Sequence, residues 1–473
     1  MRNKLSTFSE FANTLYPHEA EYLLSVQQFN KADNLKVVNL IIYNSKNPLN
    51  LQPYSTAIDK RTYSYIKKWI EDTLSKVDVD LFYNWLIEIE KQVMSDSILP
   101  EEEKVLLEKS TIIDSTHYYF IRFYQVLQHY RDYLMVRNRT RYYEEITSYL
   151  DKYNNQYVRS VGLNNELNAA AEKVVFQLTK TNDEFVLWEN LFRDIYFDLS
   201  LDGYTRYRAV VRLTILYYYA REFDKLRTVY EHLDIQFKTN IFYSKRILAN
   251  YYANRAMMHS KLNELDDAEK YGYLSIRQHN SDFLFYLVSL CGVLLKKSKN
   301  TEALHLMTNS ISELKNTISF YYKIGFVSFY IKTLDASNLH EKAVSYATTF
   351  FEGYKSEIFK FRWHLFFSSF MQVLIRAEKY SKAISYTRRY KLVAKEKQSS
   401  DKGAYLPIIF WYTLLAEYME GITSLEKFKA SIISSGKELI KQKYQSRKVF
   451  ELLDKMAFVL PNEIKEIKEV LCK

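Results

Sequence analysis

Apolar residues recur along most of the chain at positions i, i+3, i+4 and i+7, the spacing of a helix that buries one face. Pro17 and Pro100 indicate two helix starts, since proline suits a first helical turn and the acidic residues that follow suit its positive end. The segment 44–59, which contains two prolines, is the only one with an irregular pattern. The pattern therefore predicts an all-α protein.

The composition favours the same fold class. Nine glycines and six prolines in 473 residues are too few for the tight turns of a β-sandwich or the glycine loops of a nucleotide-binding α/β fold. Hydrophobic residues make up 47%, which excludes disorder over most of the length. The longest nearly unbroken apolar run, 283–295, is shorter than the ~20 residues of a membrane span, so we expect a helix buried inside protein.

Charge and cysteine content restrict the function further. The formal net charge of +10 is mild for a dedicated nucleic-acid protein, but residues 355–402 hold twelve Lys/Arg against four Asp/Glu. Cys291 and Cys472 are too far apart for a zinc motif or a disulfide framework. The N-terminal segment lacks the apolar core of a secretory signal, so we expect a cytoplasmic location.

Four segments share one frame, in which a polar turn precedes a helix with an alanine near its start. The alanines, here called anchors, are Ala268, Ala303, Ala343 and Ala383, and a weaker fifth copy has Leu226 at this position. Anchor spacings are 42, 35, 40 and 40 residues. A small anchor lets two paired helices approach closely. Two residues before the anchors lie the expected N-cap positions, occupied by Asp224, Asp266, Thr301, Glu341 and Ser381, of which four are good capping residues.

These segments resemble the tetratricopeptide repeat (TPR), which has small or aromatic residues twelve before, four after and seven after its anchor. The twelve-before positions hold Ala256, Cys291, Ile331 and Met371; the four-after positions hold Gly272, Met307, Ala347 and Thr387; the seven-after positions hold Ser275, Ser310, Phe350 and Tyr390. The family's tryptophan position carries Tyr252, Leu287, Val327 and Phe367, and its terminal proline is absent. The resemblance, over about 204–399, implies a right-handed superhelix (α-solenoid) of stacked antiparallel helical hairpins. The alternative is an unrelated all-α bundle.

We expect four parts in the chain. They are an N-terminal helical segment (1–58) with an irregular loop at 44–58, divergent hairpins (59–203), the TPR-like repeats (204–399), and a C-terminal hairpin with a capping helix (400–473). Within the flanks, the pattern predicts two helices in 59–95, two or three in 101–151, a hairpin in 163–199, a hairpin in 405–435 and a polar helix from residue 437.

The resemblance implies that the first helix of each pair lines a concave groove. In the shared frame the groove positions are Arg208, Asn250, Met257, Lys261, Lys296, Lys332, Gln372 and Arg376. Several cations in a groove would suit an acidic peptide or a free carboxylate. A protein partner of acidic character is therefore expected, and no specific ligand is implied.

Two basic stretches offer alternatives. Residues 382–395 predict a helix with Arg388, Lys391 and Lys395 on one face and Lys382 and Arg389 one step round, either a docking patch for an acidic partner or an ordinary solvated surface. In 118–143, tyrosines and phenylalanines alternate with Arg122, Arg131, Arg137, Arg139 and Arg141, as in proteins that stack single-stranded nucleic acid. Tyrosines that fill helix interfaces would give the same pattern. A regulator that contacts nucleic acid through 118–143 or 376–397 is the second hypothesis.

Motifs of enzymes are missing from the sequence. It contains no GxGxxG, GxxxxGK[ST], HExxH, GxSxG or CxxC motif, and no two histidines are spaced as a helical metal pair. We therefore expect no catalytic residue, no metal and no cofactor. The sequence favours a non-enzymatic scaffold that binds a partner segment in the groove of a helical-repeat superhelix.

Overall fold

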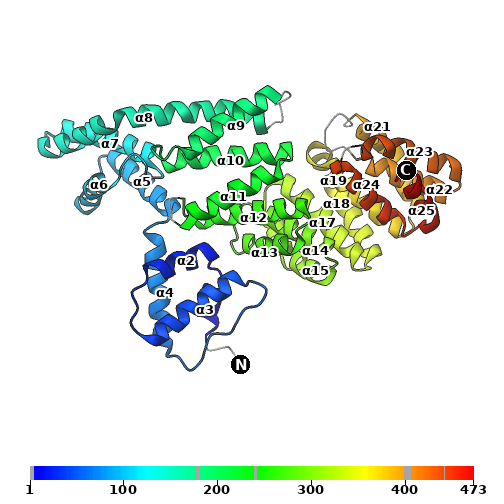
Figure 1. The fold of residues 1–473 in the computed structure, drawn as a ribbon, viewed down its shortest axis with the longest axis horizontal. Coiled ribbons are helices and arrows are strands. Elements are labelled where there is room, and N and C mark those ends of the chain that lie inside the picture. The colour runs from blue at the N-terminus through cyan, green and yellow to red at the C-terminus, as the bar shows by residue number, and fades with distance from the viewer. Residues whose placement is uncertain (1–4, 176–181, 239–241, 399–405, 442, 473) are drawn as a thin grey trace. The chain divides into compact units, whose positions relative to one another are not determined.

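The computed structural model describes residues 5–175, 182–238, 242–398, 406–441 and 443–472. Within these ranges every regular element is a helix, numbered α1 to α25 in Figure 1, and no strand is present. The prediction of an all-α protein is confirmed. The helices form two compact units, unit 1 (1–278) and unit 2 (279–473). Their boundary lies inside 204–399, the range assigned to repeats from the sequence.

Unit 1 begins with four helices. They are α1 (Ser6–Ala12), α2 (Pro17–Val26), α3 (Ala32–Lys46) and α4 (Lys60–Ser75). Pro17 opens α2 as predicted, and the segment after α3 is irregular as predicted. Asn44 holds that loop, because its side-chain amide donates to the Gln52 carbonyl (2.9 Å) while its carbonyl accepts from the Gln52 N–H (2.8 Å).

Five further helices follow. They are α5 (Val79–Met94), α6 (Pro100–Ile112), α7 (Phe120–Val136), α8 (Thr140–Val175) and α9 (Asn182–Phe197). The 36-residue α8 runs without interruption through residue 163, so the predicted start of a hairpin there is wrong. No proline and no left-handed residue occurs between 140 and 175, and the single Gly162 does not stop the helix.

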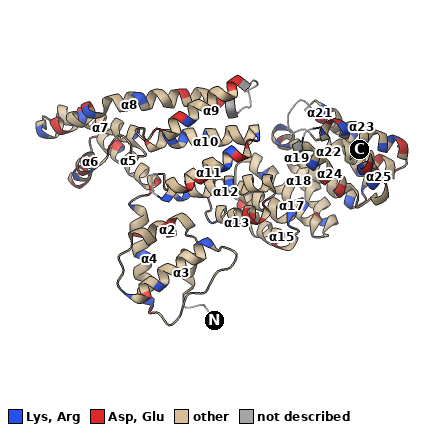
Figure 2. Cartoon of the chain, viewed as in Figure 1, with Lys and Arg blue, Asp and Glu red and all other residues tan. Residues whose placement is uncertain are grey.

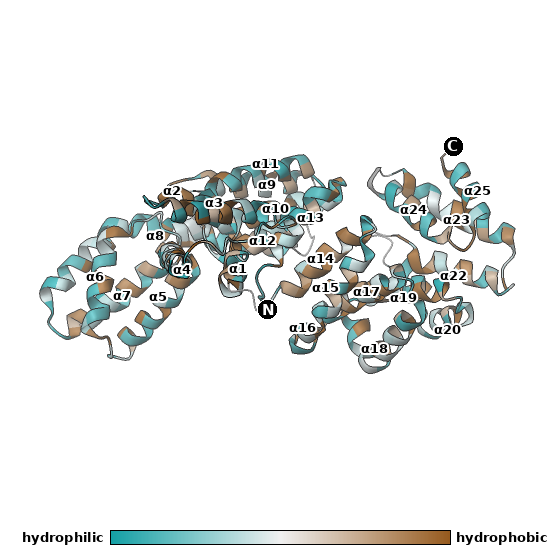
Figure 3. Ribbon diagram, turned by 90° about the horizontal axis from the view of Figure 1, so that it is seen from below, coloured by the Kyte–Doolittle hydropathy of each residue, from teal (hydrophilic) through white to brown (hydrophobic). Residues whose placement is uncertain are grey.

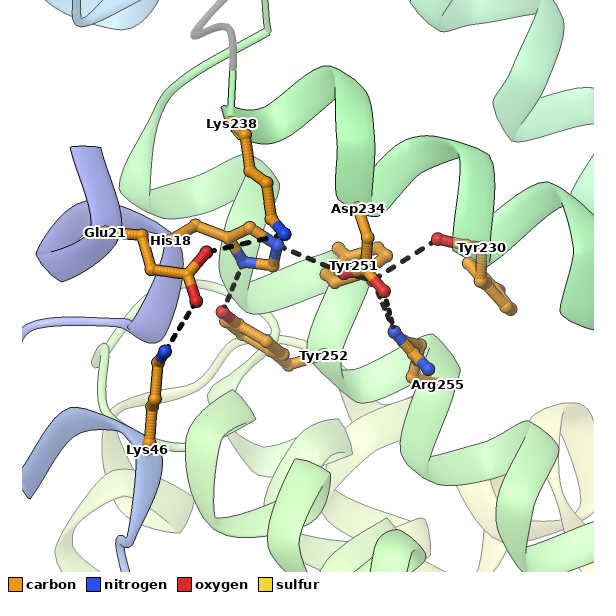
Figure 4. A network of polar contacts seen from close by, with 9 residues as sticks. All are labelled: His18, Glu21, Lys46, Tyr230, Asp234, Lys238, Tyr251, Tyr252 and Arg255. Carbon is orange, nitrogen blue, oxygen red and sulfur yellow. Dashed lines mark hydrogen bonds and ion pairs between the residues drawn. The ribbon is translucent and has the colours of Figure 1, made fainter. Parts of the chain in front are cut away.

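Unit 1 ends with α10 (Gly203–Ala220), α11 (Phe223–Lys238), α12 (Lys245–Leu262) and α13 (Leu265–Ser275). The N-terminal helices dock on this part through His18 of α2 (Figure 4). Its Nδ1 lies 2.6 Å from the Tyr252 hydroxyl of α12, and its Nε2 lies 3.0 Å from Asp234 of α11.

The Asp234 carboxylate contacts several polar side chains in this network (Figure 4). It also accepts from the Tyr251 hydroxyl and pairs with Arg255. Burial alone would raise the pKa of Asp234, but the hydrogen bond from His18 and the Arg255 charge outweigh burial, so the pKa lies below its usual value. On the surface beside it, Glu21 of α2 pairs with Lys46 at 2.8 Å and with Lys238 at 3.8 Å.

Unit 2 consists of twelve described helices. They are α14 (Phe283–Lys296), α15 (Asn300–Asn309), α16 (Ile311–Asn316), α17 (Phe320–Ala336), α18 (His340–Phe361), α19 (Trp363–Arg376), α20 (Tyr380–Tyr390), α21 (Leu392–Lys397), α22 (Ile408–Met419), α23 (Leu425–Ile440), α24 (Lys443–Met456) and α25 (Pro461–Leu471). Helices α14, α17, α19 and α22 each contact the next. Figure 3 shows hydrophobic residues along these four helices, which form the interior of the unit.

The apolar run 283–295 becomes the buried helix α14, as predicted. In the part of the chain that is described, no helix is both long enough and apolar enough to cross a membrane. The C-terminal prediction is partly wrong, because α23 continues to Ile440 and two amphipathic helices follow in place of one polar helix. Their apolar faces are buried through residues such as Val449, Leu453 and Ile464.

One turn geometry recurs before α11, α13, α15, α18 and α20. The residue five before the anchor has positive φ in all five turns: Arg221 (63°), Asn263 (67°), Ser298 (59°), Asn338 (60°) and Glu378 (57°). The N–H of the residue that follows then donates to the carbonyl of the residue nine positions before the anchor, at 2.8–2.9 Å. This is a left-handed helix cap of the Schellman type. The backbone thus closes all five turns in the same way.

The anchors occupy equivalent places after these turns. Each anchor N–H bonds to the carbonyl four residues earlier at 3.0–3.1 Å, and the four alanines are 0% exposed. The expected N-caps are wrong by two residues. The N-cap positions hold Glu264, Lys299, Leu339 and Lys379, and none of them forms a side-chain cap. The left-handed residue lets the second helix begin earlier, so Asp266 and its equivalents lie inside the first turn.

Candidate functional site

Two of the four predicted groove residues of unit 2 line a pocket of about 340 Å³ between α17, α19, α22 and α24. Lys332 and Gln372, which hold the same position in consecutive repeats, both line it. The other polar lining residues are His364, Ser368, Tyr412, Lys448, Glu451 and Lys455, and Leu406, Ile408 and Leu452 form the apolar wall. The pocket thus has three ammonium groups and one carboxylate.

Asp335 lies behind the pocket and organises its floor. Its side chain is only 1% exposed, and it accepts from Gln372 Nε2 at 3.1 Å. His340 Nδ1 (2.7 Å) and Arg376 Nε (3.2 Å) also contact it. The Arg376 guanidinium stacks on Phe458 at 4.0 Å, beyond the end of α24. The predicted groove residue Arg376 therefore neutralises a buried carboxylate and holds the C-terminal helices.

Lys332 enters the pocket from α17. It is half-buried, and its Nζ lies 5.0 Å from the Phe329 ring centroid. Removal from water and the charge of Lys455 lower the pKa of Lys332 to about 7. Burial also lowers the pKa of Lys455, against the opposing charges of Glu451 and Asp335. Among the described residues neither lysine forms an ion pair.

Two hydroxyl groups in the pocket have no hydrogen-bond partner. Ser368 is 6% exposed and Tyr412 is 1% exposed, and both oxygens are buried and unsatisfied. The His364 ring already has a polar partner, because its Nε2 lies 2.7 Å from the Glu396 carboxylate. Glu396 also accepts the N–H groups of Ile409 (3.0 Å) and Phe410 (2.9 Å) and so fixes the start of α22.

The other predicted groove residues do not reach this pocket. In unit 1, Arg208 donates to the side chains of Asn164 and Asn168 and lies over the Tyr204 ring at 5.5 Å. Asn250 lines a small hollow of about 20 Å³. Lys261 lies 6.0 Å from the Tyr218 ring centroid.

Two further residues predicted to line the groove also lie outside the lining of the lysine pocket. Met257 of α12 is half-buried in unit 1. In unit 2, Lys296 is exposed at the end of α14.

A second pocket, of about 520 Å³, lies in unit 1 around Arg208. Tyr119 lies 4.8 Å from Tyr83 and 5.6 Å from Tyr204, measured between ring centroids. Burial raises the pKa of Tyr119 far above its usual value. Arg246, also in the lining, is held by Asp80 at 2.8 and 3.0 Å.

Most of the tyrosine, phenylalanine and arginine side chains of the stretch 118–143 pack or form ion pairs inside unit 1. Tyr118, Phe120, Phe123, Tyr124 and Tyr130 are at most 3% exposed. Each of the five arginines pairs with a carboxylate, and the partners in order are Glu90, Asp132, Asp96, Glu103 and Glu145. For these side chains the packing is the interface pattern of the alternative interpretation, whereas Tyr133, Tyr142 and Tyr143 are only partly buried.

The basic stretch 382–395 does not form one helix. α20 ends at Tyr390, Lys391 is left-handed (φ 51°), and α21 begins at Leu392, so the prediction that Arg388, Lys391 and Lys395 share one helical face is wrong.

The individual side chains of this stretch also have contacts. Lys382 Nζ donates to Thr348 (3.1 Å) and Arg388 pairs with Glu417 (3.2 Å). Arg389 lies over the Tyr390 ring at 5.5 Å and Lys395 over Phe359 at 5.7 Å. Basic and acidic residues are interspersed along the helices (Figure 2).

One group of side chains has the spacing of metal ligands. Potential ligand atoms of His259, Glu264 and Asp267 lie within 4.8 Å of one another. Glu264, however, accepts from Arg227 at 2.6 Å and lies 2.6 Å from His259 Nδ1. The arginine already neutralises this carboxylate, so we assign no metal site here.

No protein-family model matches the chain, and no curated protein is similar to it in sequence.

The periodic pattern found only part of the pocket. It placed Lys332, Gln372 and Arg376 on one side of the first helices. It missed Asp335, Ser368 and Tyr412, which lie in apolar helices with no motif around them. It also missed Lys455, because the fold of α24 back onto α17 and α19 carries no local signal.

Proposed function

We propose that this chain is a non-enzymatic interaction scaffold, built as a TPR-like superhelix, that binds an acidic segment of a partner protein at the lysine pocket of unit 2. The observation that carries the proposal is the pocket itself. Lys332 and Lys455 lie without a counter-ion among the described residues, and two buried hydroxyls have no partner. Such groups suit an anionic oxygen ligand.

The TPR-like part of the proposal is supported by the recurring turn. Five turns share the left-handed cap, and the four alanine anchors are all buried. Lys332 and Gln372 both lie eleven residues before an anchor and both face the same pocket. Equivalent residues on equivalent faces are what a stacked repeat predicts. A cytoplasmic location remains a prediction from the sequence.

The non-enzymatic part is supported by the state of the reactive groups. The Ser368 hydroxyl has no described basic partner that could activate it, and His364 is committed to Glu396. No nucleophile and base are therefore paired among the described residues of the pocket.

The test compares partner capture by three forms of the full chain. The double variant Lys332→Met, Lys455→Met removes both cations with little change in side-chain length. Burial disfavours the charge of Lys332, and Lys455 is exposed, so the variant should fold about as stably as the wild type. The matched control is Lys427→Met, Lys437→Met on α23, where both lysines are exposed. A protein retained at fixed stoichiometry by the wild type and the control, and reduced at least about 10-fold by the pocket variant, supports the proposal. Equal retention by all three contradicts it.

A further inference from the structure

The donors in the lysine pocket come from four helices. α17 supplies Lys332, α19 supplies Ser368, α22 supplies Tyr412, and α24 supplies Lys455. A volume of about 340 Å³ holds a small group with the end of the chain that carries it. Donors that converge from several sides on one space match a ligand with several acceptor oxygens.

The two hydroxyls add an independent observation. A buried hydroxyl group is normally hydrogen-bonded, and those of Ser368 and Tyr412 are not. The neighbouring Ser369, by contrast, has a hydrogen-bond partner within its own helix, because its hydroxyl donates to the Leu365 carbonyl at 2.9 Å. Ser368 and Tyr412 are thus two residues of the pocket lining whose buried hydroxyl groups have no partner among the described residues.

The acidic groups near Lys332 are occupied elsewhere. Asp335 of the same helix is held by α19 and by His340, and Glu396 is held by His364 and the start of α22. Glu451 of α24 pairs with Arg447 at 2.9 Å. The remaining titratable groups in the described lining of the pocket are His364, Tyr412, Lys448 and Lys455. An additional negative charge is thus the missing partner.

We infer that the pocket binds a phosphate monoester dianion, an inference that rests on the proposed function of this pocket as the binding site. Lys332 and Lys455, when both are protonated in the complex, balance the two negative charges of a phosphate monoester, whereas a carboxylate carries one. The two ammonium groups and two hydroxyls offer more donors than the two oxygens of a carboxylate use, and they suit the three terminal oxygens of a phosphate. A phosphorylated side chain of a partner and a free phosphorylated metabolite share this chemistry.

Binding of such a dianion takes up a proton. Lys332 is mostly neutral at pH 7.5 because its pKa is about 7, and the ligand's charge raises that pKa. A phosphate monoester has its second pKa near 6 and is already a dianion at this pH. Up to about 0.8 proton per ligand should therefore be taken up by Lys332.

The test is calorimetric titration of the full chain with three probes in two buffers of different ionisation heat at pH 7.5. The probes are O-phosphoserine, an acidic peptide with one phosphoserine, and the same peptide with glutamate in its place. We expect both phosphorylated probes to bind with proton uptake, at least about 10-fold more tightly than the glutamate peptide. Tighter binding of the phosphopeptide than of O-phosphoserine assigns the phosphate to a partner segment; equal binding assigns it to a small molecule.

Variants separate this inference from the proposed function. Lys332→Met, Lys455→Met should lose binding of O-phosphoserine by at least about 10-fold, and Ser368→Ala should lose it several-fold. Lys332→Met alone should abolish proton uptake, and Lys427→Met, Lys437→Met should change nothing. A glutamate peptide that binds as tightly as the phosphopeptide, or phosphate binding unchanged in the double variant, overturns the inference. If partner capture still depends on Lys332 and Lys455 in that case, the proposed function stands.

Discussion

At the scale of single residues, Ala303 shows how a side chain without chemistry can determine the packing. It is 0% exposed and lies one turn into α15, where a larger group has no space. Its role was predictable because small residues recur at the same point of a repeated frame.

Ala303→Asp should lower the free energy of unfolding by about 3–5 kcal/mol, because it buries a charge with no partner. Thr301→Asp is the control, since Thr301 is exposed in the first turn of the same helix, where an acid is favourable. Urea unfolding of both variants measures the difference. Equal midpoints would show that the anchor position tolerates a charge and would contradict the packing described.

His117 should make unit 1 sensitive to mild acid. Burial, helped by the charge of Lys109, lowers its pKa to about 4, and its Nδ1 accepts the Tyr119 N–H at 3.3 Å. The unfolded chain binds this proton below about pH 6.5 and the folded chain only below about pH 4. The contribution of His117 to the free energy of unfolding is therefore fully present above about pH 6.5. It decreases by about 1–3 kcal/mol as the pH falls towards 4.

The measurement is urea unfolding at several pH values between 7.5 and 4.5. His117→Asn, which does not titrate, should show a smaller loss of stability over this range than the wild type. The same slope in both proteins would mean that other groups cause the acid sensitivity.

At the scale of elements, the turns contain information that the hydrophobic pattern does not. The pattern located the helices of 59–95 well. It misplaced the starts of the second repeat helices by two residues, because five non-glycine residues adopt left-handed φ and close the turn through the backbone. Only Asn263 and Asn338 among them are residue types that commonly do so. The left-handed Lys391 between α20 and α21 likewise has no signal in its sequence.

Glu378, with φ 57°, tests the shared turn. Glu378→Gly should raise the free energy of unfolding of unit 2 by up to about 1 kcal/mol, because glycine adopts this conformation without strain. Glu378→Val should lower it by a similar or larger amount, since a β-branched side chain resists positive φ. Thermal unfolding of the two variants provides the comparison. Stabilisation by valine or destabilisation by glycine would exclude the left-handed cap at this turn.

The docking of α2 depends on a buried polar contact. His18→Ala removes the partner of the Tyr252 hydroxyl and one of the contacts of Asp234, which keeps Tyr251 and Arg255, and should weaken the docking by about 1–3 kcal/mol. Hydrogen exchange of residues 17–26 should then become faster by at least about 5-fold, while Ser25→Ala, at an exposed position of the same helix, should have little effect. Unchanged exchange in His18→Ala would show that the contact does not hold the helix.

At the scale of the whole molecule, the pocket arises from contacts between segments far apart in the sequence. Helices α17 and α24 are separated by more than 100 residues, yet Lys332 and Lys455 face one space. Sequence periodicity places residues on a face of one helix, but it does not predict which distant helix covers that face. For this reason Lys332 and Gln372 could be predicted as residues of one face, whereas the pocket residues of α24 could not.

The most direct measurement of the central claim is photo-crosslinking from the pocket to the captured partner. Glu451 is the one acidic residue among the described residues that line the pocket, so benzoylphenylalanine in its place removes no cation. The account predicts crosslinks from this position to one acidic or phosphorylated segment, and none from the same probe at the exposed Glu438 of α23. Crosslinks from position 438 with none from position 451 would contradict it.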